Sequence, residues 1–128
     1  QAAVTSATPN VIRAVNSVQN VQDPGKQQEL VNNSTAAVRA LAATSAKAPN
    51  DSVDALSKIA QQAIAVNQGQ VTTAAIQSLE QVGTQTNQPE VRSRVSDSLR
   101  QLSLLAKRRG LVSHSVLAEQ ADSKVSGS

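Results

Sequence analysis

The sequence has no cysteine, no methionine and no aromatic residue at any of its 128 positions. Without cysteine, structural disulfides are excluded and a thiolate zinc site cannot form. Without aromatic side chains, the core must be built from Leu, Ile, Val and Ala, because aromatics normally supply much of the buried area. Strands favour aromatic residues, whereas Ala-rich helices pack closely without them. These absences favour an all-α fold over a β-sandwich.

Charge is scarce as well, since 16% of the residues are charged and the formal net charge is +3. This is not the dense basic footprint of a nucleic-acid binder, and no aromatic is present to stack on a base. We therefore expect no nucleic-acid partner. Ser, Thr, Asn and Gln fill the surface instead, which favours a secreted or cell-surface protein.

Long apolar runs are missing too. None approaches the roughly 20 residues of a membrane span, and no signal peptide is visible at the start. The lack of Met, with Gln1 in first place, predicts an excerpt from a longer polypeptide. We expect any membrane attachment to come through segments outside this chain.

What is present is a helical period. Apolar residues recur at the 3.6-residue spacing of an amphipathic helix in five stretches, at 9–21, 26–47, 52–68, 71–82 and 89–110. Pro9 suits the first helical position of the first stretch, and "DPG" at 23–25 separates it from the second. Short connections predict antiparallel neighbours. The pattern predicts an antiparallel bundle of about five helices over residues 1–110, and no strict internal repeat indicates a solenoid.

After Gly110 the character of the sequence changes. The stretch 111–128 is short and Ser-rich, and its "LVSHSVL" alternates apolar with polar residues. We expect an extended segment there, or a last helical turn around "SVLAEQA". We expect 111–128 to be this extended segment or a linker to a following domain.

The last predicted helix, 89–110, ends in three consecutive cations, Lys107, Arg108 and Arg109. Cations in a last turn are favoured by the helix dipole and by the unpaired carbonyls, at about 0.3–1 kcal/mol each. This structural role is the favoured interpretation of the three residues. The alternative is contact with an anionic partner, either an acidic protein or a glycan.

His114 is the one histidine of the chain, and it lies in "SHS". A Ser–His dyad can be imagined, but neighbours in sequence rarely have the needed geometry, and no Gly-x-Ser-x-Gly elbow exists. Asp51 and Asp54 begin a predicted helix, where they complement its dipole. No phosphate loop, dinucleotide fingerprint or calcium loop is present. We predict no enzyme activity, no cofactor and no metal site.

Three N-glycosylation sequons are present, at Asn32, Asn33 and Asn50. Asn32 and Asn33 overlap in "NNST" within a predicted helix, whereas Asn50 is predicted to lie at a loop. Asn50 is therefore the favoured acceptor of the three. Its alternative role is the N-cap of the helix that follows, a role that Asp51 could also take.

Two long stretches resemble a known family. "ELVNNSTAAVRALAATSAKAPNDSVDALSKIAQQAI" and "VRSRVSDSLRQLSLLAKRRGLVSHSV" are similar to the helical region of polycystin-like large surface proteins. In that family, a helical subdomain precedes a β-rich one in the juxtamembrane GAIN/REJ-type region. The resemblance implies an extracellular, membrane-tethered interaction module, with cilia among its settings. The family's autoproteolytic His-Leu-Ser/Thr motif is not matched here, since His114 is followed by Ser115 and Val116, so no catalytic role is carried over.

We therefore expect a noncatalytic extracellular structural or interaction module. Its partners would be other proteins, neighbouring domains of the same polypeptide, or other copies of itself. Two alternatives stay open. Ala-rich helices with short loops equally suit an intracellular adaptor of the cytoskeleton of the talin or vinculin kind, and they also suit a structural subunit of a filament. Glycan occupancy would distinguish the extracellular module from the cytoskeletal adaptor. Self-association would favour the filament subunit.

Overall fold

A computed structural model describes residues 2–43 and 49–127. These residues form helices and no strand, which confirms the all-α prediction for the described part of the chain. The α-helices are α1 (Ala2–Ser17), α2 (Pro24–Ala43), α3 (Pro49–Ala65), α4 (Gly69–Gln85), α5 (Pro89–Arg108) and α6 (Val112–Ser126). A short 3₁₀-helix, η1 (Val18–Asn20), follows α1 directly.

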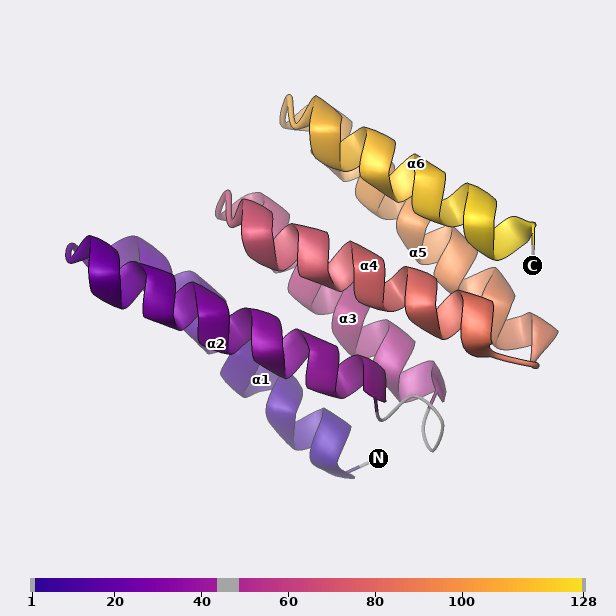
Figure 1. Ribbon diagram of the computed structural model, residues 1–128, viewed down its shortest axis with the longest axis horizontal. Coiled ribbons are helices and arrows are strands. Elements are labelled where there is room, and N and C mark those ends of the chain that lie inside the picture. The colour runs from indigo at the N-terminus through magenta and orange to yellow at the C-terminus, as the bar shows by residue number, and fades with distance from the viewer. Residues whose placement is uncertain (1, 44–48, 128) are drawn as a thin grey trace.

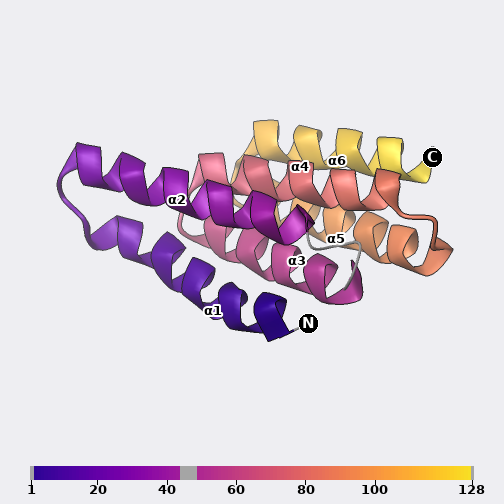
Figure 2. The ribbon, with the colours of Figure 1, turned by 60° about the horizontal axis from the view of Figure 1, so that its bottom comes forward.

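The helices form three antiparallel hairpins that stack side by side in two layers (Figure 1). One layer holds α1, α3 and α5, and the other holds α2, α4 and α6 (Figure 2). Helices of one layer therefore run in the same direction. The predicted bundle is thus laid out as a stack of helical pairs, in which each pair contacts its neighbours, as in repeat proteins.

Three prolines of the sequence are evenly spaced along this stack. Pro9, Pro49 and Pro89 follow one another at intervals of 40 residues, and each lies in the first helix of a hairpin. The residues around them differ. Pro49 and Pro89 are the first residues of α3 and α5, whereas Pro9 lies inside α1, so the equal intervals do not mark equivalent positions.

The second and third hairpins turn in the same way. Asn67 and Gly110 both have a positive φ, 60° and 77°. In each turn the next backbone N–H reaches back to a carbonyl of the last helical turn: Gln68 donates to Ala63 at 2.8 Å, and Leu111 donates to Ala106 at 2.8 Å. These are the bonds of a Schellman C-cap, and they confirm Gly110 as the predicted helix stop.

The first hairpin turns differently. The "DPG" segment, predicted as a breaker, also begins α2. The Asp23 carboxylate accepts a hydrogen bond from the Gly25 backbone N–H at 3.0 Å, as an N-cap side chain does. Pro24 follows as the first helical residue, where its fixed φ suits the helix and its missing N–H costs nothing.

Several helix boundaries differ from the predictions. α1 begins at Ala2, so Pro9 lies inside the helix rather than at its first position. α3 begins at Pro49, because proline suits a first helical turn; Asn50 is therefore inside the helix, neither at a loop nor at a cap. The helix predicted for 26–47 begins earlier, at Pro24, and is described as far as Ala43; residues 44–47 of the prediction lie outside the described residues.

The extended segment predicted for 111–128 is not confirmed, because Val112–Ser126 form α6. Its inward face carries Ser115, Ala118, Ala121 and Val125 at helical spacing, and the first three are small. The helix packs against α5 and α4. Val112 and Val116, which suggested strand alternation, are exposed. Small buried residues give a weak periodic signal, which explains the wrong prediction.

The core is entirely aliphatic and runs through both layers. The predicted stripe of the helix 89–110 is confirmed in large part, since Val91, Val95, Leu99 and Leu102 are fully buried, while Leu105 is half-buried. Among the described residues, the largest fully buried side chains are Leu56, Ile59, Ile64, Ile76, Leu79, Leu99 and Leu102.

One buried hydroxyl yields a stability prediction. Ser34 Oγ is buried and has no hydrogen-bond partner among the described residues. Removing an unsatisfied buried polar group relieves its desolvation cost, so we expect Ser34→Ala to raise the free energy of unfolding by about 1 kcal/mol. Denaturant titration of the two proteins measures the difference.

The matched control is Ser103→Ala, also in mid-helix and buried. The Ser103 hydroxyl lies 3.0 Å from Ser115 Oγ and donates to Glu119 Oε1 at 3.2 Å. Both substitutions gain the same helix propensity, but only Ser103→Ala breaks hydrogen bonds. Equal shifts in the two variants would contradict the explanation.

Candidate functional site

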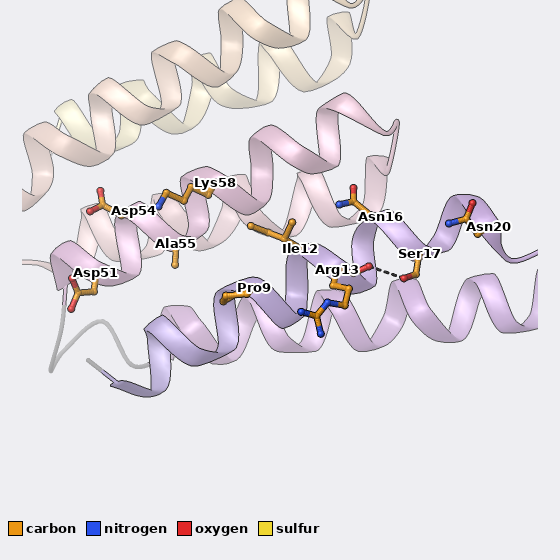
Figure 3. Close-up of a pocket in the computed structure, with 10 residues that line it drawn as sticks. All are labelled: Pro9, Ile12, Arg13, Asn16, Ser17, Asn20, Asp51, Asp54, Ala55 and Lys58. Carbon is orange, nitrogen blue, oxygen red and sulfur yellow. Dashed lines mark hydrogen bonds between the residues drawn. The ribbon is translucent and has the colours of Figure 1, made fainter.

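A groove of about 770 Å³ runs along the outer side of the stack between α1 and α3 (Figure 3). The first hairpin supplies one wall and α3 supplies the other. The lining residues are Pro9, Ile12, Arg13, Asn16, Ser17 and Asn20 on the first wall, and Asp51, Asp54, Ala55 and Lys58 on the second.

Helical spacing explains why these residues share a face. On each wall they recur at intervals of three or four residues, which places them on one strip of a helix. The opposite side of α1 buries Val11 and Val15 in the core. Ile12 is half-buried and Ala55 is 4% exposed, so these two apolar residues form the floor of the groove.

Three of the four charged side chains that line the groove, all but Asp54, have no partner in the described part of the chain. Within the described part of the chain, neither Arg13 nor Lys58 uses its side chain in a hydrogen bond or an ion pair, and the same holds for Asp51. Ser17 Oγ donates to the backbone carbonyl of Arg13 at 2.8 Å (Figure 3). The guanidinium group of Arg13 takes no part in that bond. Two cations and one carboxylate are therefore available beside the apolar floor.

In the next groove of the same layer, between α3 and α5, a charged side chain does have a partner. Between α3 and α5 the space is about 340 Å³, and Asp54 and Lys58 line it too. There Arg94 of α5 donates to Asp54 at 2.7 Å. A cross-helix ion pair thus bridges the narrower groove. Further along the α1–α3 groove, Gln62 Nε2 of α3 donates to Asn16 Oδ1 of α1 at 2.6 Å.

The three cations predicted as a contact site lie at the end of α5 and at the residue after it. Lys107 pairs with Glu119 of α6 at 2.8 Å. Arg109 Nη1 donates to the carbonyl of Ala65 at the end of α3, at 3.1 Å. Arg108 is exposed. Two of the three cations therefore join neighbouring helices, and contact with an anionic partner stays a prediction.

His114 is half-buried against the start of α4. Its Nε2 lies 3.2 Å from the carbonyl oxygen of Gly69, and a Cβ added at Gly69 would come within 3.3 Å of the ring. The adjacent Ser115 is bonded to Ser103 instead. Among the described residues no group of three or more His, Asp or Glu could hold a metal ion.

The three sequon asparagines are exposed on helices. Asn32 and Asn33 lie in α2, and Asn50 is the second residue of α3. Asn32 Oδ1 accepts a hydrogen bond from Gln28 Nε2 at 2.9 Å, whereas Asn33 and Asn50 are exposed without such a bond in the described part of the structure. The geometry therefore leaves all three accessible.

Two carboxylates of α6 bind α5. Burial, the largest single influence, raises the pKa of Asp122. The hydrogen bonds from Ser96, Arg100 and Ser126 and the charge of Arg100 together outweigh it, so the pKa lies below its ordinary 3.8. Arg100 Nε donates to Asp122 at 3.1 Å. Hydrogen bonds from Lys107 and then Ser103 lower the pKa of Glu119 below its ordinary 4.5.

Stability should therefore depend on pH through α6. Because the folded pKa of Asp122 is depressed, its contribution is fully present above the unfolded pKa and is lost as the pH falls through the folded value. We expect Asp122→Asn to lower the free energy of unfolding at neutral pH, with a difference that shrinks as the pH approaches about 2. Denaturant titrations across this range test the sign. A difference that grows on acidification would contradict it.

The groove residues were missed at the sequence level. Asp51 and Asp54 were considered only as helix-start carboxylates, and Arg13 and Lys58 were not singled out. The polar strip of α1 was readable from its spacing. Nothing in the sequence, however, places residue 12 beside residue 55, because that proximity depends on how hairpins stack.

The fold and the groove define this chain as a two-layer stack of helical hairpins with an open, charged groove. Comparison with protein-family models, with curated proteins and with solved structures finds no match. Among the described helices, none combines the length and the apolar character needed to span a bilayer.

Proposed function

We propose that this chain is a noncatalytic interaction module of a larger, membrane-associated cell-surface protein. The observation that carries the proposal is the α1–α3 groove. Its charges at Arg13, Lys58 and Asp51 have no partner in the described part of the chain, and they flank an apolar floor. A concave site with a few convergent polar groups is the usual form of a binding site, and unpaired charges on its rim select a partner by complementarity.

Sequence features support the extracellular setting. Three exposed sequons and a surface dominated by uncharged polar residues suit the secretory pathway. The likeness to the GAIN/REJ-type region of polycystin-like proteins adds membrane tethering, with a ciliary location as part of the proposal. The helix stack then acts as a rigid spacer that offers its groove to a protein partner or to a neighbouring domain.

Intact mass of the protein from its native source, before and after glycosidase treatment, tests the setting. We expect a loss of mass assigned to Asn50, Asn33 or Asn32. The overlapping sequons can be separated, because Ser34 completes the Asn32 sequon and Thr35 completes that of Asn33. Ser34→Ala therefore removes the first and keeps the second. An unmodified mass from a cytosolic source would reject the extracellular module and favour the cytoskeletal adaptor.

One observation favours a second candidate, a subunit of a filament. Leu104, Val112 and Val116 are the large hydrophobic residues exposed in the described structure, at 55%, 67% and 43%. Leu104 lies on α5 and the two valines lie on α6, all within the last hairpin, and exposed apolar residues that form one patch mark association surfaces. Sedimentation of the chain over a range of concentrations decides this candidate, since a filament subunit would self-associate.

A further inference from the structure

We propose that the α1–α3 groove receives an amphipathic helix of another protein, and that this helix presents a carboxylate within its apolar stripe. The inference rests on the proposed interaction function and adds the chemistry of the partner. Shape argues for the helix, and the distribution of charge argues for the carboxylate.

The shape of the groove suits a helix. It lies between two helices of one layer that run in the same direction, and α2 already packs across the inner side of this pair, in contact with both α1 and α3 (Figure 2). The outer side offers the same kind of furrow to a second helix. From Pro9 to Asn20 the wall rises about 16 Å at 1.5 Å per residue, or about three helical turns.

The floor defines the apolar stripe of the partner. Ile12 and Ala55 face the groove from opposite walls, and Pro9 lies one turn before Ile12 (Figure 3). A partner helix with apolar residues at positions i, i+3 or i+4, and i+7 would cover these three residues along its length. The small Ala55 allows close approach to the α3 wall.

The charges define the polar part of the partner. Arg13 belongs to α1 and Lys58 to α3, so each wall of the groove carries one cation (Figure 3). A carboxylate of the bound helix near Ile12 would be attracted by both cations, and a charge-assisted hydrogen bond to either is stronger than a neutral one. A lysine at the same place would meet two like charges.

The acidic end of the groove orients the partner. Asp51 lies seven residues before Lys58 on α3, a rise of about 10 Å, and it has no partner in the described structure. Asp54 is already engaged by Arg94. A basic residue of the partner, two turns away from its carboxylate, would pair with Asp51. The groove therefore selects one direction of the bound helix.

Selection from a displayed library tests the inference with the whole chain as bait. The probe is a set of 16-residue amphipathic helices whose apolar positions vary among Ala, Val, Leu and Ile and whose bordering positions vary among Glu, Gln and Lys. We expect enrichment of helices with Glu beside the centre of the apolar stripe. Enrichment of Lys or Gln at that place would overturn the charge argument.

Matched variants locate the binding. Arg13→Gln with Lys58→Gln removes the two groove cations, and Lys26→Gln with Arg39→Gln removes two exposed cations of α2 and changes the net charge equally. We expect the first pair to weaken binding of the enriched helices at least tenfold and the second to leave it within twofold. Equal losses in the two variants would overturn the assignment to this groove. Thermal unfolding followed by circular dichroism confirms that both variants stay folded.

Two further arms separate this inference from the proposed function. A library of extended, Pro-containing peptides is selected in parallel. Binders from that library alone would reject the helix and keep the interaction module, and binders from neither library would count against both. Self-association of the chain that is lost in the Arg13→Gln and Lys58→Gln variant would identify the occupant as a second copy, and would overturn the proposed foreign partner.

Discussion

Replacing Leu102 with Ala should lower the free energy of unfolding by about 2–5 kcal/mol. The Leu102 side chain is fully buried within α5, and α5 packs against α3, α4 and α6. Truncation loses the transfer free energy of the removed carbons and leaves a cavity, which rigid helices fill poorly. A domain held by about 5–15 kcal/mol in total would lose a large share of its stability. Denaturant titration followed by circular dichroism measures the loss.

Leu104→Ala is the matched control, two residues further along the same helix. Its side chain is 55% exposed, so the same chemical change should alter the free energy of unfolding by no more than about 0.5 kcal/mol. Similar losses at Leu102 and Leu104 would mean that α5 is turned about its axis relative to the described structure. The pair therefore tests the orientation of the helix as well as the energy of burial.

Gly83→Ala should destabilise the protein by about 1–3 kcal/mol, although alanine is the better helix former. Gly83 lies inside α4, where the exchange would normally stabilise by about 1 kcal/mol. A Cβ there would come within 2.7 Å and 2.8 Å of the two methyl groups of Val125 and within 2.9 Å of Val95. Valine has few rotamers with which to move away, so the helices themselves must shift.

A double-mutant cycle identifies the cause. Val125→Ala removes the two methyl groups that meet the new Cβ, so the combination of Gly83→Ala with Val125→Ala should cost less than the sum of the single changes. Gly25→Ala provides the control, because its Cβ would meet only the Asp23 carboxylate at an ordinary 3.4 Å. Additive costs at residues 83 and 125 would contradict the proposed contact among α4, α5 and α6.

The Gly83 contact also shows why α6 could not be predicted. α4 approaches α6 closely because glycine faces Val125, and the rest of the inward face of α6 is made of serine and alanine. Small residues bury little apolar area each, so the helical period of residues 112–126 is faint in the sequence. The packing that stabilises α6 involves residues far away in the chain, and a local sequence pattern does not identify them.

The candidate site, too, could be predicted from the sequence only in part. The helical period of apolar residues along 9–21 shows that α1 has a solvent face with Arg13 on it. The helix that carries Lys58 can be recognised from its period in the same way. Whether those two cations border one groove depends on the distance between α1 and α3. The sequence instead drew attention to Lys107 and Arg109, which the structure uses to join α5 to α6 and to α3.

The sequence by itself determined the fold class, most of the helices and the stop at Gly110. Because aromatic residues are missing, the core must be aliphatic. The 3.6-residue period sets the buried stripe of each strongly patterned helix, and glycine takes a positive φ at little cost. Only the tertiary structure decided that the helices stack as three hairpins in two layers, that residues 112–126 are helical, and that Arg13 and Lys58 border one groove. These features depend on contacts between residues distant in the chain, and their energy comes from the fit of surfaces, which a local pattern does not contain.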